Sequence, residues 1–420
     1  MLNKIIKPAH KINGVIDIPP SKSHSQRVLA CSLISKERTC IYNLGESNDE
    51  LTALEILKSS NKKISINTNS ITINSSNNFS FKKSEVTFNE AGLSCRLFTP
   101  VLANAKQELQ LIGNGSLLNR PMEIFDAIFQ ELSLEFSSNK NKLPFSIKGP
   151  IIPKTISIDG SLSSQFISGL IYAYVGSNKL RAEKIIIKNP TSIPYIELSL
   201  EVLKSFGVNL KIEHNTIQFN GPYNLKATEI TIENDWSSAS FFIVAAAILG
   251  NITFTNINLN SKQADTRILS VVKEFGANIE SKGTSIIVSK KKCLHFNFDA
   301  TDSPDLFPPL AVLASFGTKT SSIKGVRRLF TKESNRAKTI QSELSKLGAN
   351  IKISDDIMYV SPKSNPLVHK VNSCNDHRIA MAASIFALML NKPTEINNSA
   401  AINKSFPSFY KLLDSVTLQA

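Results

Sequence analysis

The stretch SKSHSQRVLACSLI, which begins at Ser21, decides the fold because its pattern returns along the chain. Polar residues that cap helices precede a run of small and apolar residues. The pattern recurs at EAGLSCRLFTPVLA from Glu90, SSQFISGLIYAYV from Ser163, DWSSASFFIVAAAIL from Asp235, DSPDLFPPLAVLAS from Asp302 and NDHRIAMAASIFAL from Asn375. The spacing is about 70 residues, roughly twice that of common solenoid repeats. Helices this rich in Ala, Ser and Gly need neighbours on all sides.

A second, amphipathic helix is predicted after the first in several repeats. Residues 195–206, 266–275 and 336–347 place apolar side chains at i, i+3, i+4 and i+7. Gly207, Gly276 and Gly348 follow these segments and can cap them in the left-handed conformation. The alternating runs at 208–212, 286–288 and 350–353 predict strands.

The repeating unit is therefore strand, buried helix, strand, amphipathic helix, strand, and it occurs six times. We expect helices packed inside an envelope of sheets, grouped three and three into two lobes. An ordinary doubly wound α/β protein is the alternative.

Composition excludes several classes of protein. The 420 residues include 48 Lys and Arg against 34 Asp and Glu, a net charge of +14, which favours an anionic partner. One Trp and seven Tyr are few for a protein that stacks on single-stranded nucleic acid. No apolar run approaches the roughly 20 residues that span a bilayer. The longest candidates, residues 241–249 and 379–390, are expected to be buried helices.

Targeting and redox features point to a cytoplasmic protein. Met1 lies just before a strand-like segment at 12–18, which leaves no room for a signal peptide. The five cysteines are scattered and never form CxxC, as expected of reduced thiols. The six histidines show no metal-ligand spacing, so no metal or cofactor is expected.

The first repeat start carries the strongest chemical signal. Two prolines end a strand and fix the entry to a helix, and Lys22, Ser23 and Arg27 follow on its first turns. The free N–H groups and the dipole at a helix start already favour an anion. The alternative is a solvated helix start with two incidental charges, but apolar residues 28–30 follow at once and favour an anion site.

Other repeat starts and loops carry similar side chains. Arg96 lies one turn into its helix after Gly92, and Arg120 follows a loop at 113–119. Residues 163–165 offer neutral hydrogen-bonding groups, whereas 332–336 and 376–378 place carboxylates beside cations, and Lys404 lies near the end. Each alone is more often a weak surface ion pair. Their recurrence at equivalent places suggests that both lobes contribute to one cationic cleft. The remaining lysines, such as Lys62, Lys63, Lys82, Lys83 and 290–292, are expected to lie on the surface and to promote solubility.

In order along the chain, PPSKSHSQR, the Arg120-Pro121 loop, SSQF, SIPYI, KESNR and NDHR together resemble the 5-enolpyruvylshikimate-3-phosphate (EPSP) synthase family. The resemblance implies an inside-out α/β barrel fold of two lobes, each with three βαβαββ units, that closes by a hinge. One lobe would span 21–230 and mainly bind shikimate 3-phosphate. The other would join 1–20 to 231–420 and contribute phosphoenolpyruvate-binding and catalytic residues.

The resemblance also implies an activity. Members of this family transfer the enolpyruvyl group of phosphoenolpyruvate to the 5-hydroxyl of shikimate 3-phosphate and release phosphate, in the shikimate pathway to chorismate and the aromatic amino acids. The two substrates bring two phosphates and two carboxylates, so a cationic site is required. The protein is expected to act as a monomer on these small molecules, with no nucleic-acid or membrane partner and no cofactor.

Residue roles are carried over from the matching motifs. Shikimate 3-phosphate would be bound by Lys22, Ser23, Arg27, Ser163, Ser164, Gln165, Ser192, Tyr195, Asp305 and Lys332. Phosphoenolpyruvate would be bound by Lys22, Gly92, Arg120, Gln165, Arg336, Arg378 and Lys404. The catalytic residues would be Lys22, Asp305 and Glu333, with Asp305 as the candidate base. A helix N-cap is the alternative for Asp305.

The sequence departs from the family pattern at Leu93 and Ile193 and at two charged positions. Glu90 stands where the family usually has Asn, and Arg328 stands four residues before Lys332, where Asn is frequent. We expect these two opposite charges to compensate one another.

Two other functions are alternatives to the one that the resemblance implies. The sister transferase that acts on UDP-N-acetylglucosamine usually has Asn after the active-site Lys and a Cys in the loop before the Arg-Pro, whereas this chain has Ser23 and no Cys at 113–119. A noncatalytic basic protein that binds nucleic acid would need a Lys/Arg stripe and binding that weakens steeply with salt. No known nucleic-acid-binding motif occurs in the sequence.

Overall fold

The computed structural model describes residues 2–419, and contacts within the chain divide it into two compact units. The middle unit is Pro20–Glu233, and the terminal unit joins Met1–Pro19 to Asn234–Ala420. The lobes expected at 21–230 and at 1–20 with 231–420 have bounds within three residues of these.

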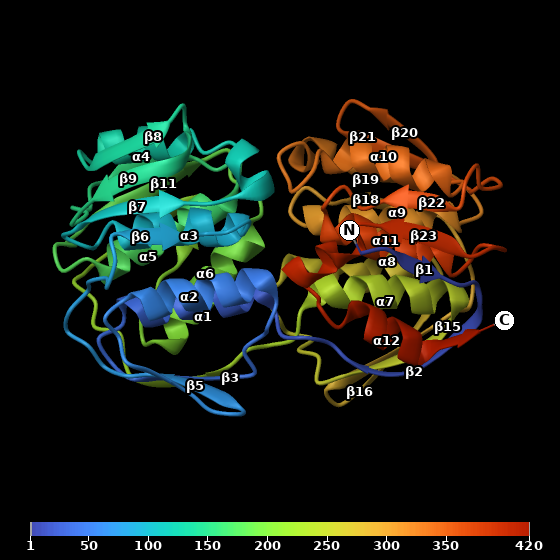
Figure 1. Cartoon of the computed structure of the whole chain (residues 1–420), viewed down its shortest axis with the longest axis horizontal. Coiled ribbons are helices and arrows are strands. Elements are labelled where there is room, and N and C mark those ends of the chain that lie inside the picture. Colours follow the sequence, from blue (N-terminus) through green and yellow to red (C-terminus); the bar gives the residue numbers. More distant parts are fainter. Residues whose placement is uncertain (1, 420) are drawn as a thin grey trace. The chain divides into compact units, whose positions relative to one another are not determined.

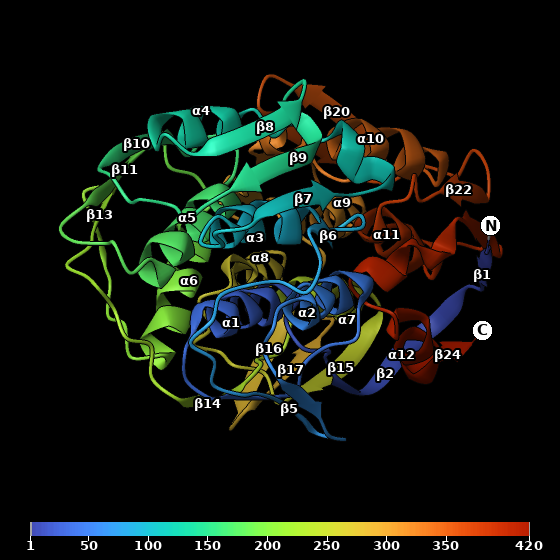
Figure 2. The ribbon, with the colours of Figure 1, turned by 60° about the vertical axis from the view of Figure 1, so that its left-hand side comes forward.

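Three sheets and six α-helices build the middle unit, residues 20–233. The sheets are β14(Thr228–Thr231)-β3(Thr39–Tyr42)-β5(Ser70–Ile73)-β4(Ile64–Ile66), β6(Glu85–Thr87)-β7(Glu108–Ile112)-β9(Lys142–Lys148)-β8(Glu135–Asn139) and β10(Ile156–Asp159)-β11(Lys184–Lys188)-β13(Thr216–Gln218)-β12(Ile212–Glu213). The helices are α1(Lys22–Ile34), α2(Asn48–Ser59), α3(Gly92–Leu102), α4(Ile124–Glu131), α5(Ser164–Gly176) and α6(Ile193–Ser205). Each sheet contains one parallel pair followed by antiparallel pairs. Figures 1 and 2 show α1, α2 and α3 between the sheet that holds β5 and the sheet that holds β7 and β9.

The terminal unit, described over 2–19 and 234–419, repeats this plan. Its sheets are β16(Asn278–Lys282)-β17(Ser285–Ser289)-β15(Gly250–Thr255)-β2(Ala9–Asp17)-β24(Thr417–Gln419), β18(Asn297–Asp299)-β19(Ser321–Lys324)-β21(Ile357–Ser361)-β20(Asn350–Ser354) and β1(Lys4–Ile6)-β23(Thr394–Asn397)-β22(Lys370–Asn372). Its α-helices are α7(Trp236–Leu249), α8(Ile268–Glu274), α9(Phe307–Ser315), α10(Arg336–Lys346), α11(His377–Ala387) and α12(Phe409–Val416). Short 3-10 turns, η1(Gly115–Asn119) in the middle unit and η2(Ala264–Arg267), η3(Pro304–Leu306), η4(Val326–Leu329) and η5(Ser399–Lys404) here, connect these elements.

At both crossings of the chain between the units, the strand before the crossing pairs within one unit, and the helix after the crossing belongs to the other unit. Strand β2 leads into α1 of the middle unit, yet it pairs in parallel with β15 of the terminal unit. Conversely, β14 leads into α7 of the terminal unit but pairs in parallel with β3 of the middle unit. The chain therefore passes between the units at 19–20 and again at 233–234.

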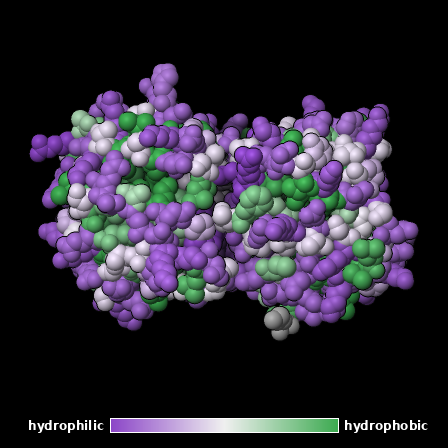
Figure 3. Space-filling view, turned by 90° about the horizontal axis from the view of Figure 1, so that it is seen from above, coloured by the Kyte–Doolittle hydropathy of each residue, from purple (hydrophilic) through white to green (hydrophobic). Residues whose placement is uncertain are grey.

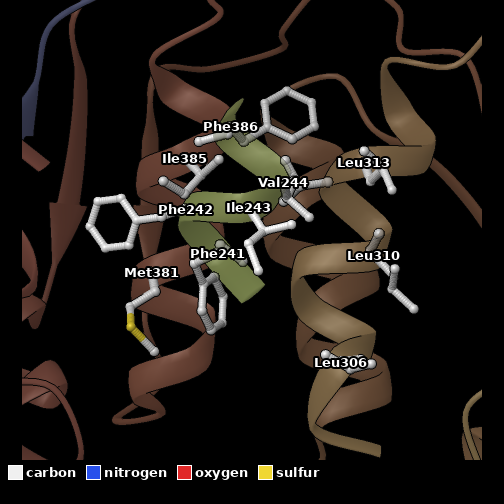
Figure 4. Packing of buried hydrophobic residues seen from close by; sticks show 14 of the residues in the cluster. Phe241, Phe242, Ile243, Val244, Leu306, Leu310, Leu313, Met381, Ile385 and Phe386 are labelled. Atoms are coloured by element: carbon white, nitrogen blue, oxygen red, sulfur yellow. The ribbon is translucent and has the colours of Figure 1, made fainter. Parts of the chain in front are cut away.

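The first helix of each repeat is buried, as its composition predicts. Residues 236–248 of α7 are all buried, which explains why this helix is apolar on every side. Phe241 and Ile243 pack with Leu310 of α9 and Met381 of α11 in the core of the terminal unit (Figure 4). A separate apolar cluster forms the core of the middle unit.

Most predicted elements agree with the structure. The predicted helices at 195–206 and 336–347 are α6 and α10, and the three capping glycines have φ of 82°, 101° and 102°. The segment 266–275 is correct only in part, because its first residues form η2 before α8 begins. The strand predicted at 208–212 is wrong apart from its last residue, because Val208 and Leu210 are buried without pairing in a sheet and β12 starts at Ile212.

The surface is mainly hydrophilic, as the charged composition predicts, but one lysine that was expected on the surface is buried. Figure 3 shows a face on which hydrophilic residues predominate and hydrophobic residues form scattered groups. Lys62 was expected on the surface, and this is wrong: it is 5% exposed and its Nζ donates to the carbonyl oxygen of Ser35, next to the last turn of α1. The position of Lys62 after α2 turns its side chain toward a helix C-terminus, which favours a cation. Among residues 2–419, no helix combines the length and apolar character needed to cross a bilayer.

Candidate active site

In the middle unit, helix α1 begins at a serine cap that is followed by a lysine. Ser21 is the N-cap, and its hydroxyl accepts from the backbone N–H of His24 at 3.3 Å. Lys22 follows, and its Nζ lies 3.0 Å from Oδ2 of Asp49 at the start of α2. The prediction of a cationic helix start near the core is confirmed, because residues 25–34 of α1 are buried.

Arg27 is buried against neutral oxygens. Its Nε donates to Ser199 Oγ at 2.8 Å, and its other nitrogens donate to the carbonyl oxygens of Ser23 at 2.9 Å and Tyr195 at 3.2 Å. Burial lowers the pKa of Arg27, and among the described residues no carboxylate forms an ion pair with it. A buried cation with only dipolar partners gains most from an added anion.

The starts of α3 and α5 lie against α1. Ser94 donates to Gln26 at 2.9 Å, which joins α3 to α1. Arg96 Nη1 donates to Gln165 Oε1 at 3.3 Å, which joins α3 to α5, and its guanidinium lies 5.1 Å from the ring centre of Phe166. The capping groups of three repeats therefore meet, as expected of helix starts placed equivalently in each repeat.

Gly92 and Arg120 are in direct contact. A Cβ added to Gly92 would lie 1.9 Å from Arg120 Nη1, so only glycine leaves room for this guanidinium above the start of α3. Arg120 is 6% exposed and caps the C-terminus of the 3-10 turn η1. The pairing of a glycine with an arginine at a helix start creates a place where backbone N–H groups and a guanidinium can approach one anion.

The remaining candidates of the middle unit lie at the starts of α5 and α6. Ser163 is the N-cap of α5, and its hydroxyl accepts from Gln165 N at 3.3 Å, while Ser164 is the first helical residue. Ser192 caps α6 with a left-handed φ of 54°, which is costly for a residue other than glycine. The Tyr195 ring lies 5.7 Å from the Arg27 guanidinium. The strained residue Ser192 therefore lies at the start of α6, the helix that supplies Tyr195 and Ser199 as partners of Arg27.

In the terminal unit, Arg336 is at the centre of a carboxylate network. Its Nε donates to Asp376 Oδ2 at 2.9 Å, its Nη1 donates to Asp305 Oδ1 at 2.8 Å, and its Nη2 donates to Glu333. Burial opposes the cation, but Asp376, Glu333 and Asp305 raise the pKa of Arg336. The network holds the loop before α10 against the start of α11.

Asp305 bridges two arginines. Its Oδ2 accepts from Arg378 Nη2 at 3.0 Å, and Lys332 Nζ lies 3.9 Å from Oδ1. Burial alone would raise the pKa of Asp305, but Arg378, Lys332 and Arg336 hold it well below the usual range. The alternative of a helix N-cap is wrong, because Asp305 lies inside η3, Ser303 precedes this turn, and the carboxylate is engaged by cations. Its side chain is 24% exposed, so it remains accessible to a ligand.

Lys332 and Lys404 complete the cations of the terminal unit. Burial lowers the pKa of Lys332 to about 8, with Asp305 acting in the opposite direction and Arg336 and Arg328 adding to the decrease. Lys404 Nζ donates to the carbonyl oxygen of Asn375 at 2.9 Å, just before α11. Lys332 can therefore exchange its proton near neutral pH.

Sequence reasoning missed Asp49, and it placed Asp376 beside Arg378 without pairing it with Arg336. Asp49 pairs with Lys22, and Asp376 caps α11 by accepting from Arg378 N at 3.0 Å while it binds Arg336. The position of Asp49 in the first turn of a helix could have been predicted, because Ser47 and Glu50 form a capping box that marks a helix start at this point. The signal for Asp376 was its place immediately before a buried helix.

Glu90 has a partner inside its own unit. Its Oε1 accepts from Ser116 N at 2.8 Å, and Gly115, at φ 55°, leaves room for the carboxylate. In the terminal unit, Asp302 and Asp305 are the carboxylates that act on Arg328, whose pKa is lowered chiefly by burial. The compensation of Glu90 by Arg328 stays a prediction.

Two groups of candidate residues result, one in each unit. The middle unit gathers Lys22, Ser23, Arg27, Gly92, Arg120, Ser163, Ser164, Gln165, Ser192 and Tyr195, and the terminal unit gathers Asp305, Lys332, Glu333, Arg336, Arg378 and Lys404. Among the described residues, no group of three or more His, Cys, Asp or Glu side chains is placed to hold a metal ion. That both groups face one cleft stays a prediction.

Comparison with solved structures supports the fold prediction. The EPSP synthase of Acinetobacter baumannii is similar with a TM-score of 0.82 at 25% identity, covering 100% of this chain and 99% of that one. The enolpyruvyl transferase NikO of Streptomyces tendae has a TM-score of 0.78 at 14% identity, over 98% of this chain and 96% of that one, and it bears on the fold alone. The prediction of an enolpyruvyl transferase fold is confirmed.

Sequence comparison identifies the family. A curated 3-phosphoshikimate 1-carboxyvinyltransferase of Clostridium novyi (strain NT) is 33% identical, covering 97% of this chain and 95% of the relative. One from Buchnera aphidicola subsp. Cinara cedri is 34% identical over 98% of this chain and 96% of the relative. The family model of EPSP synthase (3-phosphoshikimate 1-carboxyvinyltransferase) matches residues 6–413. The chain therefore belongs to the EPSP synthase family.

Proposed function

We propose that the protein transfers the enolpyruvyl group of phosphoenolpyruvate to the 5-hydroxyl of shikimate 3-phosphate and releases inorganic phosphate, in the pathway to chorismate and the aromatic amino acids. The observation that supports this best is the position of Asp305 within a chain of this family. Its partly exposed carboxylate lies between Arg336 and Arg378 and close to Lys332. These are groups that can bind anions and move protons in one place.

The reaction adds one proton to carbon and one to the leaving phosphate, and it removes two protons, one from the 5-hydroxyl and one from the new methyl group. Protonation of the methylene carbon of phosphoenolpyruvate gives its C2 atom oxocarbenium character. The 5-hydroxyl oxygen of shikimate 3-phosphate attacks C2 and loses its proton, which forms a tetrahedral intermediate. Removal of a proton from the new methyl group then restores the double bond as the C2–O bond to phosphate breaks. The protein must supply a general acid, a general base and fixed cations.

The anions would be bound chiefly by cations at helix starts. Shikimate 3-phosphate would be bound by Lys22, Ser23, Arg27, Ser163, Ser164, Gln165, Ser192 and Tyr195, together with Asp305 and Lys332. Phosphoenolpyruvate would be bound by Lys22, Gly92, Arg120, Gln165, Arg336, Arg378 and Lys404. The neutral surroundings of Arg27 support this assignment, because its guanidinium can gain an anionic partner, and the contact between Gly92 and Arg120 places a guanidinium at the start of α3.

Proton transfer would involve Asp305, Glu333 and Lys22. Asp305 would accept the hydrogen bond of the 5-hydroxyl, and it is a weak base while the two arginines and Lys332 hold its pKa low. A phosphate or carboxylate bound to Arg336 and Arg378 would compete for these guanidinium groups and so raise the pKa of Asp305. The base would therefore strengthen only when phosphoenolpyruvate is present. Glu333, which binds Arg336, would act together with Lys332 near the methylene carbon.

The protein would work as a cytoplasmic monomer on small molecules, with no nucleic-acid or membrane partner. The middle unit would mainly bind shikimate 3-phosphate, and the terminal unit would add phosphoenolpyruvate-binding and catalytic residues. The family membership supports the small-molecule substrates.

Phosphate release by the purified protein tests the proposal. Release is expected with phosphoenolpyruvate and shikimate 3-phosphate together, and not with either alone. The variant Glu333→Gln should lower the rate by about 10²–10⁴, which is the usual contribution of a general acid or base. The matched control is Glu343→Gln, on the same segment but bound to Lys346. An active protein whose Glu333→Gln variant keeps full activity would contradict the role of Glu333.

The same assay separates the competing functions. Release of phosphate with UDP-N-acetylglucosamine in place of shikimate 3-phosphate would identify the sister activity. Binding of RNA at physiological salt without any turnover would favour the noncatalytic alternative. The family match favours neither outcome.

A further inference from the structure

Asp265 is a buried carboxyl group that the proposed reaction does not use. It lies in the 3-10 turn η2 of the terminal unit and is 0% exposed. Its Oδ2 shares a short hydrogen bond with the hydroxyl of Ser237, on the first turn of α7. Among residues 2–419, no group forms a hydrogen bond with its Oδ1. One oxygen of a fully buried carboxyl group is thus without a donor, a costly arrangement for the ionised form.

The charges around Asp265 belong to the candidate active site. Asp305 and Asp235 repel its negative charge, whereas Arg378 attracts it and Ser237 favours it by hydrogen bonding. Asp235 is the N-cap of α7 and accepts from Ser238 N at 2.6 Å. Burial and Arg336 oppose the charged form of Arg378, whereas Asp305, Asp265 and Asp235 each favour it and together raise its pKa.

A protonated Asp265 fits this arrangement better than an ionised one. Burial, with repulsion from Asp305 next, raises the pKa of Asp265 to about 7. If Asp265 were ionised, its negative charge would add to those of Asp305 and Asp235 around Arg378, with Arg336 opposing them, and would disfavour an anionic substrate. One proton on Asp265 removes part of that charge.

We propose that Asp265 is a positioning residue that holds a proton at neutral pH and, by losing it, weakens the hold of Arg378 on an anionic substrate. The proposal rests on the proposed role of Arg378 as a ligand of phosphoenolpyruvate. When Asp265 is protonated, Arg378 interacts with Asp305 and with the incoming anion. When Asp265 loses its proton to solvent, its new charge attracts Arg378 and repels both Asp305 and the substrate.

The pH dependence of kcat/KM for phosphoenolpyruvate tests this role. Between about pH 6 and pH 8.5, wild-type kcat/KM should fall about tenfold relative to Asp265→Asn, which keeps the shape of the side chain and has no proton to lose. The substrate phosphates titrate near pH 6 in both proteins, so the ratio of the two profiles isolates Asp265. The effect should be expressed in KM, while kcat changes little.

Ser237→Ala provides a second variant with an opposite expectation. The Ser237 hydroxyl favours the ionised form of Asp265, so its removal should move the fall in kcat/KM to higher pH. A buried carboxyl group with a purely structural role would give no such shift. An exposed carboxylate, Glu55 in the middle unit, gives the matched control, because Glu55→Gln should leave the profile unchanged.

Two measurements without substrate separate this proposal from the proposed function. The infrared difference spectrum between about pH 6 and pH 8.5 should show loss of a protonated carboxyl C=O band, absent in Asp265→Asn. The folded protein binds one more proton at Asp265 than the unfolded chain between about pH 4 and pH 7, so the free energy of unfolding should fall with rising pH in that range more steeply in wild type than in Asp265→Asn. A missing band together with parallel kcat/KM profiles would overturn the proposal, even if the enzyme is active. The band without a KM effect would overturn the role in binding.

Discussion

In the middle unit Arg27 and Lys62 are buried against neutral oxygens, whereas in the terminal unit Arg336 and Arg378 are buried against carboxylates. Burial lowers the pKa of Arg27, and it lowers the pKa of Lys62 to about 8. In the terminal unit the surrounding carboxylates overcome burial and raise the pKa of both arginines. The first kind of site leaves positive charge to be neutralised by a ligand, and the second is neutralised by the protein itself.

This difference suggests that the two units contribute differently to stability and to binding. A cation that is buried with carboxylate partners stabilises the fold, because its removal leaves unpaired negative charges. A cation with only dipolar partners costs free energy to bury, so its removal is tolerated by the fold but not by an anionic ligand. The variants below test this contrast, from the largest expected effect to the smallest.

Arg336→Met should have the largest effect on stability. It leaves Asp376, Glu333 and Asp305 without their shared partner, which is expected to cost about 3–5 kcal/mol of unfolding free energy. Urea denaturation followed by circular dichroism measures this loss. Lys338→Met is the matched control, since Lys338 is exposed on the same helix. A loss for Arg336→Met no larger than for the control would contradict the role of the network.

Lys22→Met should mainly affect catalysis. Removal of a cation that stabilises transition-state charge is expected to lower kcat/KM by about 10²–10³, while the free energy of unfolding changes by about 1 kcal/mol or less. Phosphate release and urea denaturation on the same preparation give both values. Lys36→Met, past the far end of α1, serves as the control for kcat/KM. Because Lys22 has one carboxylate partner, Asp49, a loss of stability as large as that of Arg336→Met would mean that this single pair stabilises the fold as much as the network of the terminal unit.

Gly92→Ala should raise the KM for phosphoenolpyruvate by about tenfold, the factor that corresponds to about 1.4 kcal/mol. The added methyl group would lie 1.9 Å from Arg120 Nη1, and the end of this flexible side chain must move away. Gly92 has no left-handed φ, so the fold should remain stable. Gly283→Ala, where a Cβ would meet nothing within 4 Å but the left-handed φ of 59° disfavours alanine, is the control for backbone strain, and it should lower stability without changing the KM. An unchanged KM would show that Arg120 does not need its present position.

Much of this contrast could not be predicted from the sequence. The six helix starts could be, because capping residues before Ala- and Ser-rich runs are local signals, and α1, α7 and α11 begin within two residues of the predicted starts. Lys22 and Arg336 were predicted as site residues by motif. The pairing of Lys22 with Asp49 and of Arg336 with Asp376 was not predicted, because Asp49 lies in the next helix and Asp376 lies 40 residues from Arg336.

Burial was predicted less well than secondary structure. Lys62 lies in a Lys- and Asn-rich stretch that suggests a surface loop, yet the tertiary fold places it below Ser35. Asp265 lies in an ordinary polar turn, and only its position against Ser237 makes it unusual. Both depend on long-range packing that leaves no periodic trace in the sequence.

Lys62→Met should have the smallest effect, and its sign tests the contrast most directly. The pKa of Lys62 is about 8 in the folded protein, below its ordinary 10.5. Its protonation therefore lowers stability as the pH falls from about 10.5 to 8, with no further change below. Because methionine cannot protonate, Lys62→Met should become more stable relative to wild type as the pH falls from about 10 to about 7. The loss of the hydrogen bond to Ser35 offsets part of this gain, so the net difference at neutral pH should be about 1 kcal/mol or less. Urea denaturation at both pH values measures the difference. Lys63→Met, at the exposed neighbouring position, should show no such dependence. A loss of several kcal/mol at neutral pH would mean that the middle unit depends on its buried cations as much as the terminal unit does.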